Sequence, residues 1–470
     1  MNAIANRTHF QIHQSAKYFD ARELQAQTGQ PASAFGEVVL KELIDNALDA
    51  CESAGIEPVI SIGYAAVDNR LRIAVSDNGA GISEDVINNI LNFNTRTSDK
   101  AAYKSPTRGA QGNAFKTIIG IPHALGGGAI VIESKGLRHE INASATPAGT
   151  VEVDRQTSAI DETIGTTVYV DMPFRECYPY WYARATALFN PHAFVKISSF
   201  DDIGFSMVIA DEENAEIDEF YKRLGECQKI KPNEPTSAHW YGADDFEKLV
   251  FLQGSQKDIP LGEFVRQFRG LSSSAKAKQI TGQLKQFKLV SDIYREPIAI
   301  ESMRQAMQSE CKPVQPKALG AIGEASLLAR LNIVDDHEVM ALGSLIGGLG
   351  TPEPFNSNRH WYKQVSGMID NVPYVFEIMI AESDGATGFY HGVNHSPTFG
   401  DFLRQTTIKS GEIEGVGIAG ALALITQSQE HIVIAHLIGI GLPFLDHGKS
   451  NGYPLKTGQN AELATVYLYH

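Results

Sequence analysis

Cysteine is scarce in this sequence, and signals for export or membrane insertion are missing. The four cysteines among 470 residues lie far apart and form no CxxC pair, so we expect no zinc site. This use of cysteine is compatible with a protein of the reducing cytosol. Residues 1–30 contain no apolar stretch of the kind found in secretory signals. The most apolar region, 418–445, is interrupted by glutamine, glutamate and histidine, which favours two buried strands over a membrane span. The sequence therefore predicts a cytoplasmic protein without a membrane segment.

Positive charge is also in short supply. The formal net charge is −15, which argues against a surface that coats DNA generally but is compatible with a local basic groove. The hydrophobic fraction of 43% and the charged fraction of 20% are ordinary for a globular protein. A chain of this length is expected to form about two to three domains.

The stretch 35–55, FGEVVLKELIDNALDACESAG, carries the most informative pattern. Its apolar residues recur at three- and four-residue spacing, which predicts an amphipathic helix. Glu42, Asn46 and Asp49 lie four and then three residues apart, so they share one face of that helix. Their oxygens suit Mg²⁺ bound beside substrate phosphates, and a spare carboxylate can act as a general base. A solvated polar helix face would have the same composition.

Three glycine-containing motifs follow this helix. Val75–Ile82, VSDNGAGI, reads as the end of a buried strand and a glycine turn, where Asp77 can accept a hydrogen bond from an exocyclic amine. Residues 107–116, TRGAQGNAFK, place a glycine turn in front of a predicted helix, which is typical of an anion site. Residues 165–170, GTTVYV, place a glycine before a β-rich run.

The four motifs, in this order and spacing, resemble the nucleotide site of the GHKL ATPases, which include gyrase, Hsp90, MutL and the histidine kinases. The resemblance implies an ATP- and Mg²⁺-binding site in which Glu42 is the general base, Asn46 the Mg²⁺ ligand and Asp77 the adenine anchor. It implies nucleotide contacts from Asn46, Asp49, Asp77, Gly79, Gly81, Ile82, Thr97, Ser98, Arg108, Gly109, Ala110, Gln111, Gly112, Asn113 and Thr166.

Hydrophobic patterning predicts an α+β chain. We expect a sheet covered on one face, with strands at 58–64, 71–75, 129–134, 149–154, 166–172 and 205–210. The polar loop 94–107 has the character of a lid, and its Lys104 is one of three basic residues that could sense phosphate. Helical periodicity then dominates at 217–226, 244–253, 260–270 and 272–287, and further on a turn and helix at 316–331 precede strands at 373–381, 431–440 and 461–469.

The order of these segments is similar to the B subunit of DNA topoisomerase VI. The likeness is carried by ELIDNALDACESAGIEP, the GAQG motif and KPVQPKALGAIGEASLLARL, and GVNHSP resembles the family's NR-P turn. By this resemblance Lys449 is the switch lysine that reaches the γ-phosphate. The resemblance implies an N-terminal arm at 1–33, a GHKL (Bergerat) ATPase sandwich at 34–212, a helix-two-turns-helix-like domain at 213–315, and a transducer domain of ribosomal S5-like fold at 316–470. The family's long docking helix for the DNA-cleaving A subunit has no counterpart after the last predicted strand.

The predicted helical domain holds the most basic segment of an acidic chain. Arg266, Arg269, Lys276 and Lys278 are its candidate DNA contacts. An ordinary pair of solvated helices would have the same composition.

Three hypotheses follow for the function. The first is an ATPase subunit like that of a type IIB topoisomerase, which dimerises on ATP and gates duplex DNA, with any cleavage supplied by a partner A subunit. The second is a standalone GHKL clamp or switch that regulates another effector, such as a nuclease in bacterial defence or repair. The third is a chaperone-like GHKL protein without a role on nucleic acid.

Overall fold

The structure, a computed structural model, describes residues 14–93, 103–106, 108, 114–146, 149–199, 219–332, 355–383, 388–399, 407–409, 412–414 and 431–442. No helix within these ranges is both long and apolar enough to cross a membrane.

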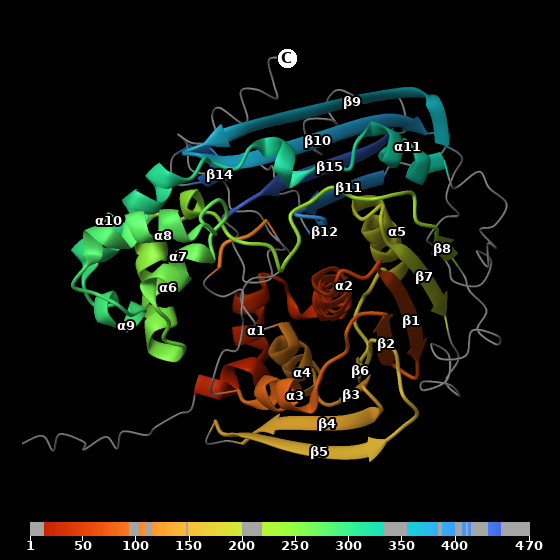
Figure 1. Ribbon diagram of the computed structural model, residues 1–470. Helices are drawn as coiled ribbons and strands as arrows, with labels where there is room; N and C mark the ends of the chain where they lie inside the picture. Colours follow the sequence, from red (N-terminus) through yellow and green to blue (C-terminus); the bar gives the residue numbers. More distant parts are fainter. Residues whose placement is uncertain are drawn as a thin grey trace, which may run out of the picture.

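An eight-stranded sheet forms the base of the N-terminal half (Figure 1). Its spatial order is β5-β4-β3-β6-β2-β1-β7-β8, and all neighbours are antiparallel except β1 and β7. The strands are β1 (Val59–Val67), β2 (Arg70–Asp77), β3 (Ala129–Ser134), β4 (Leu137–Ala145), β5 (Val151–Ala159), β6 (Thr166–Pro173), β7 (Phe194–Ser199) and β8 (Glu219–Tyr221).

Most strands of this sheet match the predicted ones. β3 has the predicted bounds, and β1, β2, β5 and β6 overlap their predicted ranges. The sequence did not predict β4, β7 or β8, and the predicted strand at 205–210 lies outside the described residues. The prediction of a helix at 217–226 was wrong, because Glu219–Tyr221 instead forms a strand that pairs with β7. Periodicity considers only neighbouring residues, so it could not show that this segment would pair with β7.

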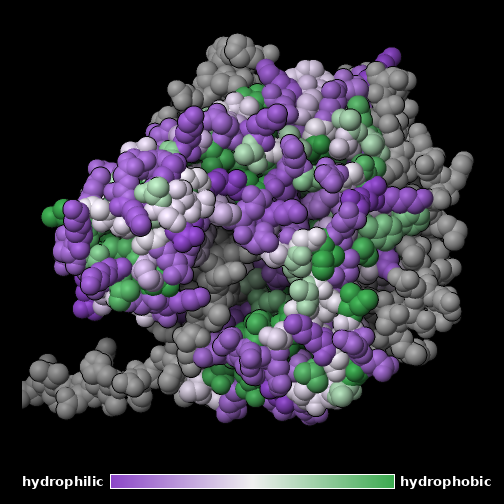
Figure 2. All heavy atoms as spheres, in the orientation of Figure 1, coloured by the Kyte–Doolittle hydropathy of each residue, from purple (hydrophilic) through white to green (hydrophobic). Residues whose placement is uncertain are grey.

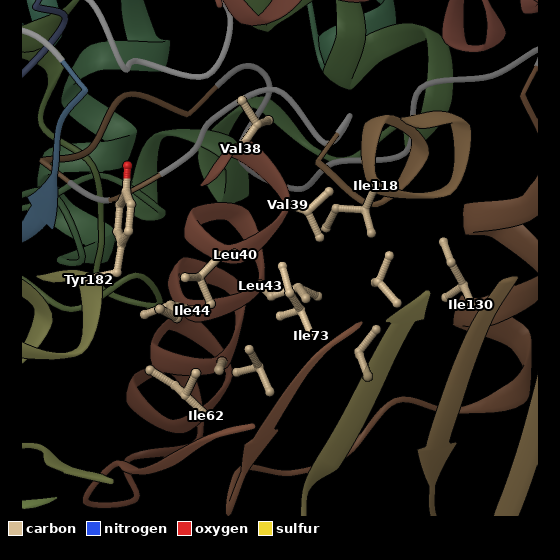
Figure 3. Packing of buried hydrophobic residues seen from close by; sticks show 14 of the residues in the cluster. Val38, Val39, Leu40, Leu43, Ile44, Ile62, Ile73, Ile118, Ile130 and Tyr182 are labelled. Atoms are coloured by element: carbon tan, nitrogen blue, oxygen red, sulfur yellow. The ribbon is translucent and has the colours of Figure 1, made fainter. Parts of the chain in front are cut away.

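Helices cover one face of this sheet. Leu71, Ile73 and Val75 alternate along β2 into the core beneath them. Figure 3 shows Leu43 over Ile73, and each such buried side chain contributes about 1.5–3 kcal/mol. The predicted α+β fold with a sheet covered on one face is confirmed. The covering elements are η1 (Gln14–Phe19), α1 (Ala21–Thr28), η2 (Ala32–Ala34), α2 (Phe35–Ala54), α3 (Glu84–Leu91), α4 (Ala114–Ala124) and α5 (Pro179–Phe189).

Part of the predicted N-terminal arm packs on its own chain. Tyr18 and Phe19 of η1 are buried in the core that lies between the first sheet and its helices. A Cβ at Gly120 of α4 would lie 1.7 Å from the carbonyl oxygen of Tyr18, so only glycine allows this approach. Residues 1–13, which include the start of the predicted arm, lie outside the described residues.

The middle of the chain is helical, as predicted, and has its own core. Phe264 and Phe268 lie in this core together with Ile280 and Leu284. Val375 and Ile438 of the second sheet join the same cluster, so the helical part packs against that sheet. Its elements are η4 (Ala238–Trp240), α6 (Ala243–Gln256), α7 (Leu261–Arg266), α8 (Ser274–Thr281), η5 (Gly282–Leu284), α9 (Val290–Ile293) and α10 (Pro297–Glu310).

A second sheet completes the described chain, with the order β12-β11-β15-β10-β9. The predicted turn and helix before it are present as η6 (Pro316–Leu319) and α11 (Glu324–Asn332), whereas the predicted strand at 461–469 lies outside the described residues. Its strands are β9 (Phe355–Ile369), β10 (Val372–Ser383), β11 (Gly388–Val393), β12 (Ser396–Pro397) and β15 (His431–Gly439); β13 (Thr407–Lys409) and β14 (Glu412–Glu414) pair separately. The domain boundaries at 33, 212 and 315 stay a prediction.

Candidate functional site

Helix α2 carries the polar stripe that the sequence singled out. Its apolar side packs on the sheet, and Gly55 ends it in the left-handed conformation at φ 70°. Glu42, Asn46 and Asp49 are each only partly buried, unlike the core residues of the same helix. The structure thus places all three predicted residues on the side of α2 that the core leaves open.

The amide of Asn46 is the least satisfied group of the stripe. Within the part of the chain that the structure describes, its Nδ2 atom is buried and has no hydrogen-bond partner. An orphaned buried amide costs about 1–3 kcal/mol, which favours a site built for a ligand. The amide oxygen of Asn46 is a hard ligand of the kind that Mg²⁺ prefers alongside several waters, which leaves the carboxylate of Glu42, one helical turn away, for the role of a base.

Asp77 ends β2 and lies under the first glycine turn. Its Oδ1 accepts a hydrogen bond from the backbone N–H of Gly79 at 2.7 Å, and β2 pairs Asp77 with Thr166 of β6. Burial raises the pKa of the Asp77 carboxyl to about 6, although the N–H groups of Gly79 and Thr166 act in the opposite direction. A buried carboxylate with few partners is suited to accept a hydrogen bond from a ligand amine.

The glycine turn touches helix α2 directly. A Cβ at Gly79 would lie 3.0 Å from the carbonyl carbon of Ala50. Next to it, the thiol of Cys51 donates to Asn78 Oδ1 over 3.2 Å, and the N–H of Val59 donates to the same atom at 2.9 Å. The turn after β2 and the Asp49 end of the α2 stripe are therefore neighbours, as the predicted site requires.

The fourth motif, which begins at Gly165, lies beside Asp77 at the end of β2. Gly165 has φ +73°, and a Cβ there would lie 1.9 Å from the carbonyl oxygen of Asp77, so glycine is required on both steric and conformational grounds. The hydroxyl of Ser134 donates to the Gly165 carbonyl at 2.8 Å and accepts from the N–H of Ile82 at 2.9 Å. Gly81, Ile82 and Thr166 are thereby brought together beside Asp77, whereas Ser134 was not predicted.

Arg108 has different partners from those expected of a nucleotide contact. Arg108 is 3% exposed, and its guanidinium donates to both carboxylate oxygens of Glu52 at 3.0 Å. It also donates to Asp49 Oδ1 at 3.2 Å and to Asn190 Oδ1. Arg108 and Asp49 are thus paired with each other inside the protein, and a direct role of either on nucleotide stays a prediction.

Glu52 is the centre of a buried charge cluster that the sequence did not predict. Burial alone would raise the pKa of its carboxyl, but Arg108 and Lys229 hold that pKa well below the usual value. His192 Nε2 lies 3.0 Å from Glu52 Oε1, and Lys229 contacts the same oxygen. Glu52 lies three residues after Asp49 and extends its stripe, a signal that could have been found, but its partners come from distant segments.

The other predicted residues divide into two groups. Lys104, a predicted phosphate sensor, forms an ion pair with Asp245 of α6. Those that lie outside the described residues are Thr97, Ser98, Gly109, Ala110, Gln111, Gly112, Asn113 and Lys449.

The four candidate DNA contacts lie on or near α7 and α8. Arg269 forms an ion pair with Glu234 at 2.6 Å, and Lys276 donates to the carbonyl oxygens of Gly270 and Glu310 at 3.0 and 2.6 Å. Arg266 and Lys278 are exposed. On the face drawn in Figure 2, hydrophilic residues cover most of the helical part, which also suits an ordinary solvated surface.

Part of the chain that contains this site is similar to a known protein family. Residues 35–176 match the family described as histidine kinase-, DNA gyrase B- and HSP90-like ATPase. This range contains α2, the Asp77 turn and β6.

The chain is also similar to curated proteins named as the B subunit of type 2 DNA topoisomerase 6. That of Saccharolobus islandicus is 26% identical over 66% of this chain and 58% of its own length. That of Thermococcus sibiricus is 23% identical over 58% and 47%, and that of Archaeoglobus fulgidus is 44% identical over 15% and 12%. The chain therefore covers less than two thirds of each of these relatives.

Among solved structures, the chain matches the ATPase and transducer domains of DNA topoisomerase II from Balamuthia mandrillaris. The match covers 89% of this chain and 75% of the other, at 9% identity and a TM-score of 0.36. A likeness at this level supports no argument about function.

Proposed function

We propose, since residues 35–176 match the family described as histidine kinase-, DNA gyrase B- and HSP90-like ATPase, that this chain is the Mg²⁺-dependent ATPase component of a machine resembling a type IIB topoisomerase. In this proposal two copies associate when ATP binds and close around a segment of duplex DNA. The sequence relatives favour this function over a standalone clamp or a chaperone.

One observation carries the ATPase part of the proposal. The turn after β2 is in contact with α2 at Gly79 and Ala50, so a buried carboxylate, glycine backbone and an oxygen-rich stripe border the same space. This is the set of groups that an adenine ring, a phosphate chain and a magnesium ion require. Such sites act mainly by positioning and by compensating charge.

Each group has a proposed role. Asp77 anchors the adenine amine, Asn46 holds Mg²⁺, and Glu42 polarises the attacking water. Mg²⁺, when bound, would neutralise charge on the β- and γ-phosphates. Lys41 Nζ lies 4.0 Å from Glu42 Oε1, which keeps a positive charge close to the proposed base. Lys449 is proposed as the lysine that reports the γ-phosphate to the second sheet.

The partners are proposals of the same kind. Duplex DNA is expected on the helical part, and DNA cleavage would need a separate A subunit. A cytoplasmic location is part of the proposal, since all four cysteines are free, as a reducing compartment leaves them.

Glu42→Ala tests the assignment of the base. We expect ATP to bind within about threefold of the wild-type affinity while kcat falls by roughly 100-fold or more, because a positioned base contributes at least that factor. Steady-state phosphate release and equilibrium binding of a fluorescent ATP analogue measure the two effects. Glu247→Ala, which removes an exposed glutamate from α6, should leave both unchanged. Retained turnover in Glu42→Ala would reject Glu42 as the base.

A further inference from the structure

The turn between β11 and β12 is a hairpin turn that is buried instead of exposed. Asn394, His395 and Ser396 are 4%, 1% and 5% exposed. Asn394 and His395 have φ angles of 51° and 65°, and two successive non-glycine residues in this region store strain that the surroundings must offset. Polar residues in a strained and buried turn indicate a specific contact.

The second sheet holds this turn from behind. The Asn394 side-chain oxygen accepts a hydrogen bond from the N–H of Gly439 at 2.9 Å. The N–H of His395 donates to Nε2 of His436 at 3.1 Å, so Nδ1 of His436 carries the proton that it donates to Glu377 at 3.2 Å. Glu377 is 1% exposed. The turn is therefore fixed to the middle strands β10 and β15.

The front of the turn contacts the ATPase domain. The hydroxyl of Ser396 donates to Asp45 Oδ2 on α2 at 2.7 Å. The carbonyl oxygen of His395 accepts from Asn190 Nδ2 at 2.9 Å and from Arg108 Nε at 3.3 Å. Figure 1 shows β12 beside α2, so one turn of the second sheet touches both α2 and the Arg108 cluster that pairs with Asp49.

The residue that Ser396 binds lies between the two proposed catalytic groups. Asp45 immediately precedes Asn46 and follows Glu42 by three residues. Lys41 donates to Asp45 Oδ2 at 2.8 Å and also lies near Glu42. Ser396 and Lys41 thus share one carboxylate oxygen, and the hydroxyl fixes the orientation of the pair that flanks the proposed base.

We propose that Ser396 is a positioning residue for ATP hydrolysis: from the second sheet, it holds Asp45 and Lys41 so that Glu42 and Asn46 keep their reactive geometry. The inference rests on the proposed ATPase function. It adds a contact between the two domains that does not pass through the nucleotide.

Ser396→Ala tests this inference. Misplacement of a base by a fraction of an ångström lowers the rate without removing ligand contacts, so we expect kcat to fall about tenfold while KM for ATP stays within about twofold. Amide hydrogen exchange in residues 42–47 should become faster. In a double-mutant cycle, Asp45→Ala combined with Ser396→Ala should cost little more than the larger single effect, because each change removes the hydrogen bond between Ser396 and Asp45.

Thr398→Ala is the matched control. Thr398 is also a buried hydroxyl of this segment, 1% exposed, and it bonds to His391 within the second sheet. Its loss should leave kcat and α2 exchange near wild type. If Ser396→Ala changes neither α2 exchange nor kcat more than Thr398→Ala does, the inference is wrong. If the wild-type chain neither binds nor hydrolyses ATP, the proposed function fails, while the exchange comparison still decides whether Ser396 holds α2.

Discussion

At the scale of single residues, the protonation state of Asp77 is the property of the site that a change of pH tests most directly. Asp77 is 8% exposed, and burial raises the pKa of its carboxyl to about 6 from an ordinary value of 3.8. In the protein without ligand, ionising this group is therefore less favourable when folded than when unfolded. Its contribution to stability is largest below about pH 4, declines between pH 4 and 6, and is constant above that range.

Nucleotide binding should have the opposite dependence on pH. An adenine amine that donates to the Asp77 carboxylate favours the ionised form, so affinity is expected to rise as pH increases through about 6. With a pKa near 6, binding to the ionised form alone predicts about tenfold weaker affinity at pH 5 than at pH 7.5. Titrations of a fluorescent ATP analogue at three pH values measure this. Asp77→Asn should bind weakly at every pH, and an unchanged profile in that variant would remove Asp77 from the adenine site.

Several site residues could be predicted because their signals are local. The spacing of Glu42, Asn46 and Asp49 follows from helical periodicity, and a glycine such as Gly165 marks a position where a side chain has no room. The cluster around Glu52 could not be predicted in the same way. Its partners Lys229 and His192 come from segments far along the chain, and single-sequence patterns contain no record of such contacts.

At the scale of elements, α7 and α8 show that a segment with many basic residues does not present all of them to a ligand. The sequence predicts these helices and their basic character, and both are present. It does not indicate that Arg269 is paired with Glu234 or that Lys276 is bound to two carbonyl oxygens. Of the four predicted contacts, Arg266 and Lys278 are the exposed ones in the described chain. Arg266 Nε also donates to the carbonyl oxygen of Ser272 at 3.1 Å, but exposure makes these two residues better placed for phosphate than Arg269 and Lys276.

The double variant Arg266→Ala/Lys278→Ala tests the DNA surface. If each residue contacts a phosphate, duplex affinity should fall and the slope of log K against log salt should lessen by about two, since each contact contributes about 0.9. Fluorescence anisotropy at several salt concentrations measures both. Lys248→Ala/Lys257→Ala removes two exposed lysines from another part of the helical domain and should leave the slope unchanged. Equal slopes in all three proteins would place DNA elsewhere.

At the scale of the whole molecule, buried polar contacts join the two sheets. Arg330 of α11 is 5% exposed, and its guanidinium donates to the carbonyl oxygens of Ala187 and Ala193 at 2.9 and 3.3 Å. Burial lowers the pKa of this group to about 10. Together with the Ser396 contact, it links the end of α5 and the middle of α2 to the second sheet. Movement of α2 is therefore expected to reach that sheet.

ATP is expected to change the assembly state. A non-hydrolysable ATP analogue with Mg²⁺ should convert the 51.2 kDa chain to a species of twice that mass, because a ligand that binds the dimer better shifts the equilibrium towards it. Light scattering coupled to size exclusion measures this. Asp77→Asn should remain monomeric at the same analogue concentration. A wild-type monomer under saturating analogue would contradict the proposed clamp.

The proposed function depends most on one magnesium–triphosphate site between α2 and the glycine turns. Calorimetric titration of a non-hydrolysable ATP analogue, with Mg²⁺ and with EDTA, tests it for the wild type and for Asn46→Ala. We predict saturable wild-type binding that Mg²⁺ strengthens at least tenfold, and in Asn46→Ala a loss of most of that magnesium dependence. No saturable binding, or the same magnesium dependence in both proteins, would contradict the account.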